Sequence, residues 1–162
     1  RAADYVRAYP DQVSILLSVE LCSLTLQLKD FSIPNLISSG LFGDGAAAAI
    51  LVGDERQAAG PRVVATRSIF YPHTEQVTEI SSWVAHTGGP KVLQAMEESL
   101  ELGPEALAIT WRSLEQVGNL SSTSVLIVLE EMMYNHRPAA GSFGLLLALG
   151  PGFCSELVLL QW

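Results

Sequence analysis

The sequence predicts an α/β fold, in which helices pack against a sheet built largely from buried strands. Near-continuous apolar runs at 13–21 and 142–149 are typical of strands that are covered on both faces. Between them, apolar residues recur at helical spacing in two segments, 90–100 and 104–117. Strands that alternate with helices are the pattern of α/β domains, or of α+β domains with a mixed sheet.

The first half predicts one helix and three strands. Pro10 stops the first helix, because proline cannot continue the helical hydrogen bonds. Gly43-Asp44-Gly45 predicts a turn in which a glycine adopts a positive φ. The elements expected here are a helix at 2–9 and strands at 13–21, 46–52 and 62–71, with an irregular stretch at 23–39.

The second half predicts three helices between strands. Pro90 can occupy a first helical turn, where its missing N–H costs nothing, and Gly118 provides a helix stop. Ser121 and Ser122 are suitable N-caps for a third helix. The elements expected here are a strand at 81–86, helices from Pro90, from near Pro104 and over 123–134, and an antiparallel pair at 142–149 and 154–161.

Composition limits the class of protein. The 162 residues carry a net charge of −8, so no basic surface is available for nucleic acid or for an anionic membrane. No apolar run approaches the roughly 20 residues that span a bilayer. Two cysteines are too few for a disulfide scaffold, which makes a reducing cytoplasm the expected location. Charged residues reach only 16% against 49% hydrophobic residues, as expected for part of a larger body or for an oligomer.

Several chemical motifs have simpler structural interpretations. Gly43-Asp-Gly-Ala-Ala-Ala48 fits a loose dinucleotide-binding pattern, but a strand rather than a helix is expected after it. Cys22 ends an apolar strand, where an inert buried thiol is favoured over an activated nucleophile. The three histidines, His73, His86 and His136, have no cysteine or carboxylate at zinc-ligand spacing, so no metal site is expected.

His86 and Asn119 are the two polar residues best placed for chemistry. His86 ends a predicted strand and is followed at once by Gly88-Gly89-Pro90 and a helix. Open α/β sheets place ligands at such strand ends. Asn119 lies in a tight connection between two predicted helices, from which an amide can point into a shared cleft.

Read in order, five stretches resemble the C-terminal portion of a type III polyketide synthase, the chalcone-synthase-like branch of the thiolase superfamily. Each stretch alone is weak, but together their order and spacing are specific and cover most of the chain. The matching stretches are Val19-Glu-Leu-Cys-Ser-Leu-Thr-Leu26, Leu41-Phe-Gly-Asp-Gly-Ala-Ala-Ala48, His86-Thr-Gly-Gly-Pro-Lys91, Gly118-Asn-Leu-Ser-Ser122 and Leu149-Gly-Pro-Gly-Phe153.

The resemblance implies a thiolase-like fold with layers in the order α-β-α-β-α, incomplete in this chain. It also implies a decarboxylative Claisen condensation, in which malonyl-CoA loses carbon dioxide and its enolate attacks an acyl group held by a cysteine. His86 and Asn119 match the catalytic histidine and asparagine, which donate hydrogen bonds to the malonyl thioester oxygen. As an imidazolium, His86 would also favour the cysteine thiolate.

The resemblance assigns further residues to binding. Phe42 matches an aromatic gatekeeper between the CoA tunnel and the cavity, and Gly88, Gly89 and Lys91 fall where the family's main chain contacts the pantetheine arm. No resident cofactor is implied, because the CoA thioesters are substrates, and a homodimer is the expected assembly. The positions that match the cavity wall are Cys22, Thr25, Gly150, Pro151 and Gly152.

The chain also departs from the family pattern. The family's nucleophilic cysteine lies shortly upstream of the helix expected at 2–9, so it is absent here, as are the basic residues that hold the CoA phosphates. Relatives also carry further elements where Ile80 meets Ser81, which indicates an internal gap. We therefore expect residues 1–80 to end the first thiolase-like half. Residues 81–162 would form the C-terminal half without its opening elements.

Three functions follow, and the sequence leaves them open. The first is a fragment of a type III polyketide synthase that is inactive alone. The second is a non-catalytic remnant that binds a full-length partner through an uncovered apolar face. The third is another condensing enzyme of the superfamily, similar to ketoacyl synthase III, against which the Leu41–Gly45 and Gly150–Gly152 stretches argue.

Overall fold

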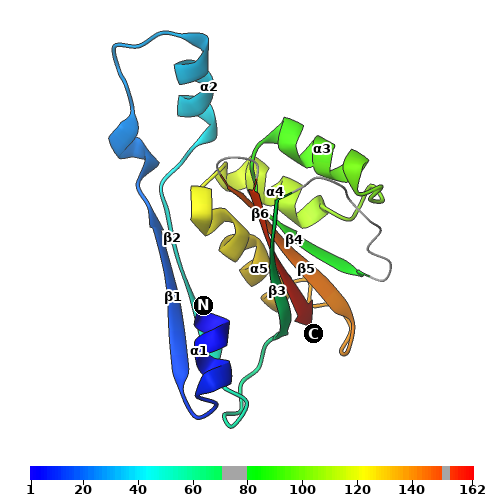
Figure 1. The fold of residues 1–162 in the computed structure, drawn as a ribbon. Coiled ribbons are helices and arrows are strands. Elements are labelled where there is room, and N and C mark those ends of the chain that lie inside the picture. The colour runs from blue at the N-terminus through cyan, green and yellow to red at the C-terminus, as the bar shows by residue number, and fades with distance from the viewer. Residues whose placement is uncertain (71–79, 151–153) are drawn as a thin grey trace.

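The structure, a computed structural model, describes residues 1–70, 80–150 and 154–162, and of residues 68–70 only the backbone. A two-stranded ribbon and a four-stranded sheet are its two β units (Figure 1). The elements are α1 (Ala2–Ala8), β1 (Val13–Glu20), η1 (Cys22–Thr25), α2 (Ile33–Leu41), β2 (Gly45–Val52), β3 (Arg62–Phe70), β4 (Ser82–Ala85), α3 (Pro90–Ser99), α4 (Ala108–Val117), η2 (Ser121–Thr123), α5 (Ser124–Tyr134), β5 (Phe143–Gly150) and β6 (Cys154–Gln161).

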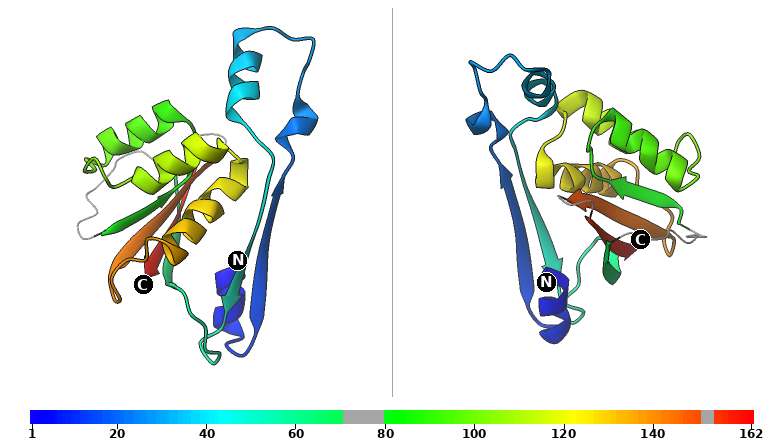
Figure 2. Two further views of the ribbon diagram at one scale, coloured as in Figure 1. Left: turned by 180° about the vertical axis from the view of Figure 1, so that it is seen from behind. Right: turned by 45° about the horizontal axis from the view of Figure 1, so that its top comes forward.

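The ribbon consists of β1 and β2, which pair antiparallel from Val13↔Val52 to Glu20↔Gly45. The chain between these strands, which includes η1 and α2, projects beyond the rest of the molecule in every view (Figures 1 and 2). At the opposite end of the ribbon, Gly53 lies against Pro10, and a Cβ on Gly53 would come within 2.1 Å of the Pro10 carbonyl oxygen. Only glycine allows the chain to approach itself so closely here.

The four-stranded sheet has the order β3-β6-β5-β4. β4 runs parallel to β5, whereas β6 is antiparallel to both of its neighbours, β5 and β3. The buried Trp162 indole N–H donates to the Ser82 hydroxyl at 2.9 Å, which ties the chain end after β6 to the start of β4.

Each face of this sheet carries its own apolar cluster. Alternate residues of a strand point to opposite faces, so the odd-numbered residues of β4 and β5 pack against α3 and the even-numbered ones against α5. The first cluster comprises Trp83, Ala85, Leu93, Met96, Leu107, Leu145 and Leu147. The second comprises Val84, Val125, Val128, Met132, Leu160 and Trp162.

Helices α1 and α5 lie between the ribbon and the sheet. α1 contacts both ribbon strands, while α5 contacts β2 on one side and β4 and β5 on the other. The Arg7 guanidinium of α1 donates to the carbonyl oxygens of Val63 and Val64, both at 3.0 Å, beside an irregularity in the β3–β6 register. The layers therefore run ribbon, helices α1 and α5, sheet, and helix α3, with α4 beside β4.

Most of the predicted elements are confirmed, and four local predictions are wrong. The strand predicted at 13–21 is not covered on both faces, because Ile15, Leu17 and Val19 are 60%, 72% and 66% exposed. The irregular stretch at 23–39 contains a helix, α2, with Pro34 in its first turn. Ser121 and Ser122 do not cap α5; instead the Ser124 hydroxyl accepts the Leu120 N–H at 2.8 Å. No glycine of the Gly43-Asp44-Gly45 turn has a positive φ.

None of the helices in the described residues has the length and apolar character that a membrane span needs.

Replacement of Leu93 by alanine tests the α3 side of the sheet. The side chain is 0% exposed, so we expect Leu93→Ala to lower the free energy of unfolding by about 2–5 kcal/mol, through lost burial and the cavity left behind. Leu28→Ala is the control, because Leu28 is 78% exposed and its loss should change stability by less than about 0.5 kcal/mol. Chemical denaturation measures the free energy of unfolding of both variants. An equal loss in Leu93→Ala and Leu28→Ala would contradict the placement of Leu93 in the core.

Candidate functional site

Three loops that are far apart in the sequence meet at one end of the molecule. The Asn119 N–H donates to the Leu41 carbonyl oxygen at 2.8 Å, and the Gly43 N–H donates to the Asn119 carbonyl oxygen at 3.0 Å. These two bonds place Phe42 and Asn119 opposite each other in an isolated parallel bridge. The buried Thr87 hydroxyl, next to His86, donates to the Gly118 carbonyl oxygen at 3.1 Å. The loops that carry Phe42, His86 and Asn119 are therefore held together directly.

Glycines make this meeting sterically feasible. Gly118 has φ +74° and ψ −155°, a conformation open almost only to glycine. A Cβ there would lie 2.8 Å from the Leu41 carbonyl oxygen. Gly43 and Gly45 pack against Leu120, with a hypothetical Cβ 3.0 Å from its side chain in each case. Close packing, and not a positive φ, therefore explains the glycines of the Gly43-Asp44-Gly45 turn.

The Asn119 side chain is buried and oriented. It is 3% exposed, and its Oδ1 accepts the Ser121 N–H at 2.8 Å. Ser121 itself has a φ of +54°, in the left-handed region that few non-glycine residues adopt. Because the carbonyl end of the amide is occupied, the NH2 group is the end available to donate. Among the described residues nothing accepts a hydrogen bond from it.

His86 lies immediately after β4 and continues the pairing of that strand. Its backbone N–H donates to the Leu147 carbonyl oxygen at 2.9 Å, and its carbonyl oxygen accepts the Gly88 N–H at 2.8 Å. Burial lowers the pKa of the His86 imidazole, because a partly buried ring loses hydration that favours its charged form. The His86 ring in this chain is therefore mainly neutral at pH 7, and a neutral imidazole donates one hydrogen bond.

Two carboxylates at the end of the ribbon hold neighbouring loops. The Asp44 carboxylate accepts the Ser23 hydroxyl at 2.6 Å and the Ser23 N–H at 2.7 Å, which fixes η1 to the turn after Phe42. The Glu20 carboxylate accepts the Ser122 hydroxyl and, at 3.3 Å, the Ser122 N–H. These donors lower the pKa of both carboxyl groups. Sequence reasoning missed both residues, because a lone carboxylate beside a turn gives no indication of its partner.

The remaining predicted site residues are spread around these loops. Phe42 is 44% exposed, and Cys22 is half-buried in η1, where the Thr25 hydroxyl donates to its carbonyl oxygen at 2.8 Å. Gly89 is buried with a φ of +126°, and a Cβ on it would lie 3.5 Å from the Leu41 side chain. The other positions are Gly88, which is half-buried, Lys91 and Gly150, which are exposed, and Pro151, Gly152 and His73, which lie outside the described residues.

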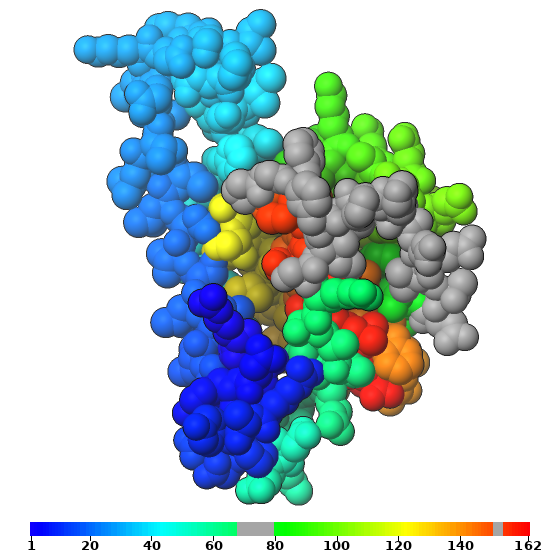
Figure 3. Space-filling view, in the orientation of Figure 1, coloured from blue at the N-terminus to red at the C-terminus, as the bar shows by residue number. Residues whose placement is uncertain are grey.

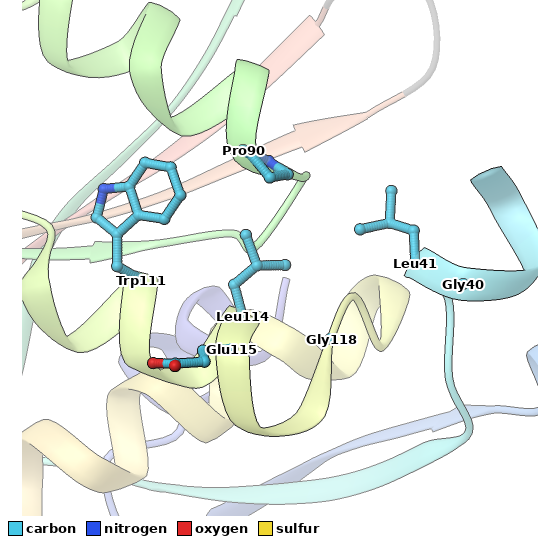
Figure 4. A pocket seen from close by; sticks show the side chains of 7 residues that line it. All are labelled: Gly40, Leu41, Pro90, Trp111, Leu114, Glu115 and Gly118. Carbon is cyan, nitrogen blue, oxygen red and sulfur yellow. The ribbon is translucent and has the colours of Figure 1, made fainter.

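A cavity of about 330 Å³ opens beside the same loops (Figure 4). Trp111 and Leu114 of α4 face Leu41 across it, and Pro90 lies at its edge. None of the predicted site residues lines it. Trp111 and Leu114 belong to the segment 104–117, whose apolar residues recur at helical spacing, and this spacing alone does not distinguish a packed face from a cavity wall. No group of three or more potential metal ligands occurs among the described residues.

Comparison with known proteins identifies the family. Residues 67–162 match the family profile described as chalcone and stilbene synthases, C-terminal domain, and the chain belongs to this family. It is 44% identical to a 1,3,6,8-tetrahydroxynaphthalene synthase of Streptomyces peucetius and 32% identical to a putative chalcone synthase of Bacillus subtilis. All of this chain is matched, but only 54% and 57% of those relatives, so it spans about half of their length.

Solved structures give the same fold. The tetrahydroxynaphthalene synthase of Streptomyces coelicolor matches all of this chain with a TM-score of 0.90 at 28% identity, and the match covers 57% of that enzyme. Germicidin synthase of the same species matches 99% of the chain with a TM-score of 0.86. The chain therefore has the thiolase-like fold of type III polyketide synthases, in part. The match to the Streptomyces peucetius enzyme runs over 206 positions, 44 more than the 162 residues here, so the matched region of that enzyme is longer than this chain.

Gly118→Ala tests the meeting of the loops. We expect a loss of stability on the order of 1–3 kcal/mol from backbone strain alone, and more because the new Cβ collides with Leu41. Gly141→Ala is the matched control, since Gly141 has a φ of +83° but no atom near its would-be Cβ. Urea denaturation should show the larger loss for Gly118→Ala. If Gly118→Ala loses no more stability than Gly141→Ala, Gly118 and the Leu41 carbonyl oxygen are not in tight contact.

Asp44→Asn tests the clamp on η1. The folded-state pKa of Asp44 is lowered from 3.8 by its bonds to Ser23, so its stabilising contribution is complete above that value. The contribution is lost as the pH falls through the lowered pKa. The stability difference between the parent chain and Asp44→Asn should therefore be largest near neutral pH and shrink on acidification. A pH-independent Asp44→Asn effect would contradict the clamp.

Proposed function

We propose that the chain is part of a type III polyketide synthase that joins malonyl-CoA to an acyl-CoA starter by decarboxylative Claisen condensation. In this reaction the bond between C2 and the carboxylate of the malonyl group breaks and carbon dioxide leaves. The remaining electron pair forms an enolate, whose carbon attacks the thioester carbonyl of an acyl group on a cysteine. A carbon–carbon bond forms and the cysteine thiolate departs.

His86 and Asn119 are the residues proposed to stabilise the enolate. Negative charge develops on the malonyl thioester oxygen as carbon dioxide leaves, and two fixed N–H donors lower the energy of that state. The observation that carries this proposal is the oriented Asn119 amide, whose Oδ1 is bound by Ser121 and whose NH2 group is left as a donor in the loop cluster next to His86. A donor fixed before the reaction costs no reorganisation when charge appears.

The protonation state of His86 depends on what lies beside it. Burial favours the neutral ring in this chain, and a neutral imidazole supplies the one N–H that the enolate oxygen needs. A cysteine thiolate close to the ring would favour the imidazolium, since an opposite charge raises a histidine pKa. We propose that this thiolate belongs to the part of the enzyme outside the matched half.

The substrate and assembly assignments complete the proposal. Phe42 would border the entrance to the cavity, Cys22, Thr25 and the Gly150–Gly152 loop would line it, and Gly88, Gly89 and Lys91 would contact the pantetheine arm of CoA. The whole enzyme would be a homodimer. Residues 1–80 would end its first thiolase-like half and 81–162 would form the second, although β3 (Arg62–Phe70) pairs with β6 in the sheet of the second.

A labelled-substrate assay tests this function. We expect the chain alone to make no polyketide from an acyl-CoA and radiolabelled malonyl-CoA. Co-expressed with the unmatched part of the Streptomyces peucetius synthase, it should release labelled carbon dioxide and form labelled product. Asn119→Ala should then lower kcat by about 10²–10³, the usual cost of one oxyanion donor. Asn135→Ala, at an asparagine bound to Glu131 on the end of α5, should leave the rate unchanged.

Two results would contradict the proposed role. Product from the isolated chain would show that no outside nucleophile is needed. Unchanged decarboxylation in both Asn119→Ala and His86→Ala would show that these side chains do not stabilise the enolate.

A second candidate is a non-catalytic remnant that binds a partner, and the exposed apolar side chains of the N-terminal third favour it. Leu17, Phe31 and Ile33 are each more than 70% exposed. Size-exclusion chromatography with light scattering separates the candidates: a soluble, folded monomer would argue against a partner-dependent remnant.

A further inference from the structure

We infer that Glu20, at the end of β1, is a positioning residue for Asn119, which it holds in place through Ser122 of η2. In this role Glu20 acts on the reaction only through the orientation of the Asn119 amide. The inference rests on the donor role proposed for Asn119 above, and it names the residues that keep the amide oriented for that role.

The Asn119 amide is oriented by a backbone N–H in a strained turn. Its Oδ1 accepts the Ser121 N–H at 2.8 Å. Ser121 has a φ of +54°, a conformation that a non-glycine residue keeps only when its surroundings hold it there. Relaxation of Ser121 to a negative φ would reorient the peptide group that carries this N–H. The amide could then rotate and present its oxygen in place of its NH2 group.

Glu20 binds the residue that follows this strained position. Its carboxylate accepts the Ser122 hydroxyl and, at 3.3 Å, the Ser122 N–H. The bond from the Ser122 hydroxyl lowers the pKa of Glu20, so the carboxylate is ionised at neutral pH and can only accept. One carboxylate therefore fixes both the side chain and the backbone of Ser122, directly after Ser121.

Ser18 strengthens the attachment of η2 to β1. Ser18 and Glu20 are two residues apart in a strand, so their side chains point to the same side. The Ser18 hydroxyl oxygen lies 2.7 Å from that of Ser122 and 2.9 Å from that of Thr123. Because the proton of Ser122 goes to the carboxylate, Ser18 is the donor in its bond to Ser122. Hydroxyls that donate in sequence toward a carboxylate polarise one another, which strengthens each bond.

The cross-strand partner of Glu20 is Gly45, which lets η2 approach the ribbon. Leu120 packs where a Gly45 side chain would lie, with the would-be Cβ 3.0 Å from it. η2 contacts both ribbon strands, and the yellow segment around it lies against the blue ribbon in the space-filling view (Figure 3). The bonds to Leu41 and Gly43 thus fix the backbone at Asn119, and Glu20 fixes the turn that follows.

Steady-state kinetics test the positioning role in the labelled-substrate assay with the co-expressed part of the Streptomyces peucetius synthase. Glu20→Ala should lower kcat by about tenfold and leave KM unchanged, because it disorders a donor that acts only in the transition state. Glu20→Gln keeps the acceptor oxygen and should restore kcat to within about threefold of the parent value. Glu131→Ala is the matched control and should leave kcat unchanged, since that carboxylate also binds a neighbouring side chain, Asn135 at 2.7 Å, but toward the far end of α5.

A measurement on this chain alone does not depend on the reaction. The NMR order parameter of the Asn119 NH2 group should be near the value of about 0.85 for a rigid backbone, and should fall below about 0.6 in Glu20→Ala. Ser122→Ala removes the donor in place of the acceptor and should give the same loss. The double variant should lose no more than either single variant, since both substitutions remove the same bond. Denaturation curves separate a disordered amide from a lost fold.

Two results would overturn the inference. The first is an Asn119 amide that stays ordered in both Glu20→Ala and Ser122→Ala. The second is a Glu20→Gln variant that loses as much kcat as Glu20→Ala, which would show that the charge of Glu20 matters and not the position of its acceptor oxygen. A disordered amide with unchanged decarboxylation would instead contradict the enolate role proposed for Asn119 and leave the positioning by Glu20 intact.

Discussion

The backbone contact between Leu41–Gly43 and Gly118–Asn119 is the constraint on which the rest of the site depends. Two hydrogen bonds, from the Asn119 N–H to Leu41 and from the Gly43 N–H to Asn119, join a loop after α2 to the turn before α5. They form only because Gly118, Gly43 and Gly45 carry no side chains where the chains approach. The orientation of the Asn119 amide and the position of Phe42 both follow from this contact.

Sequence patterns predicted most of the fold because apolar residues form continuous runs in the strands and recur at helical spacing in the helices. The run at 13–21 and the pair at 142–149 and 154–161 form strands within one residue or so of the predicted limits. Helix α2 was missed because Pro34, Ser38, Ser39 and Gly40 weaken its propensity, although Ile33, Leu36, Ile37 and Leu41 recur at helical spacing. The resemblance to type III polyketide synthases supplied the layered architecture, which local patterns alone could not provide.

The candidate site was only partly predictable, for a physical reason. His86 and Asn119 stand at recognisable strand and helix ends, but their neighbours are determined by long-range packing. The Asp44 bonds to Ser23 and the Glu20 bonds to Ser122 join segments about 20 and 100 residues apart, so no local pattern indicates them. The glycines of the Gly43-Asp44-Gly45 turn were correctly singled out but for the wrong reason, since Leu120 packs where their side chains would lie. The chain spans about half the length of its relatives, and the outer side chains of the β1–β2 ribbon beside the site are exposed and apolar.

The central proposal is that the His86 imidazole and the Asn119 carboxamide lie close enough to donate hydrogen bonds to the same oxygen. A nuclear Overhauser measurement between the His86 ring protons and the Asn119 NH2 protons tests it most directly. We expect a cross-peak between these two groups, one that disappears in Asn119→Asp and persists in Asn135→Asp. Absence of the cross-peak, with both side chains assigned and the backbone contact between Leu41 and Asn119 intact, would contradict a shared site.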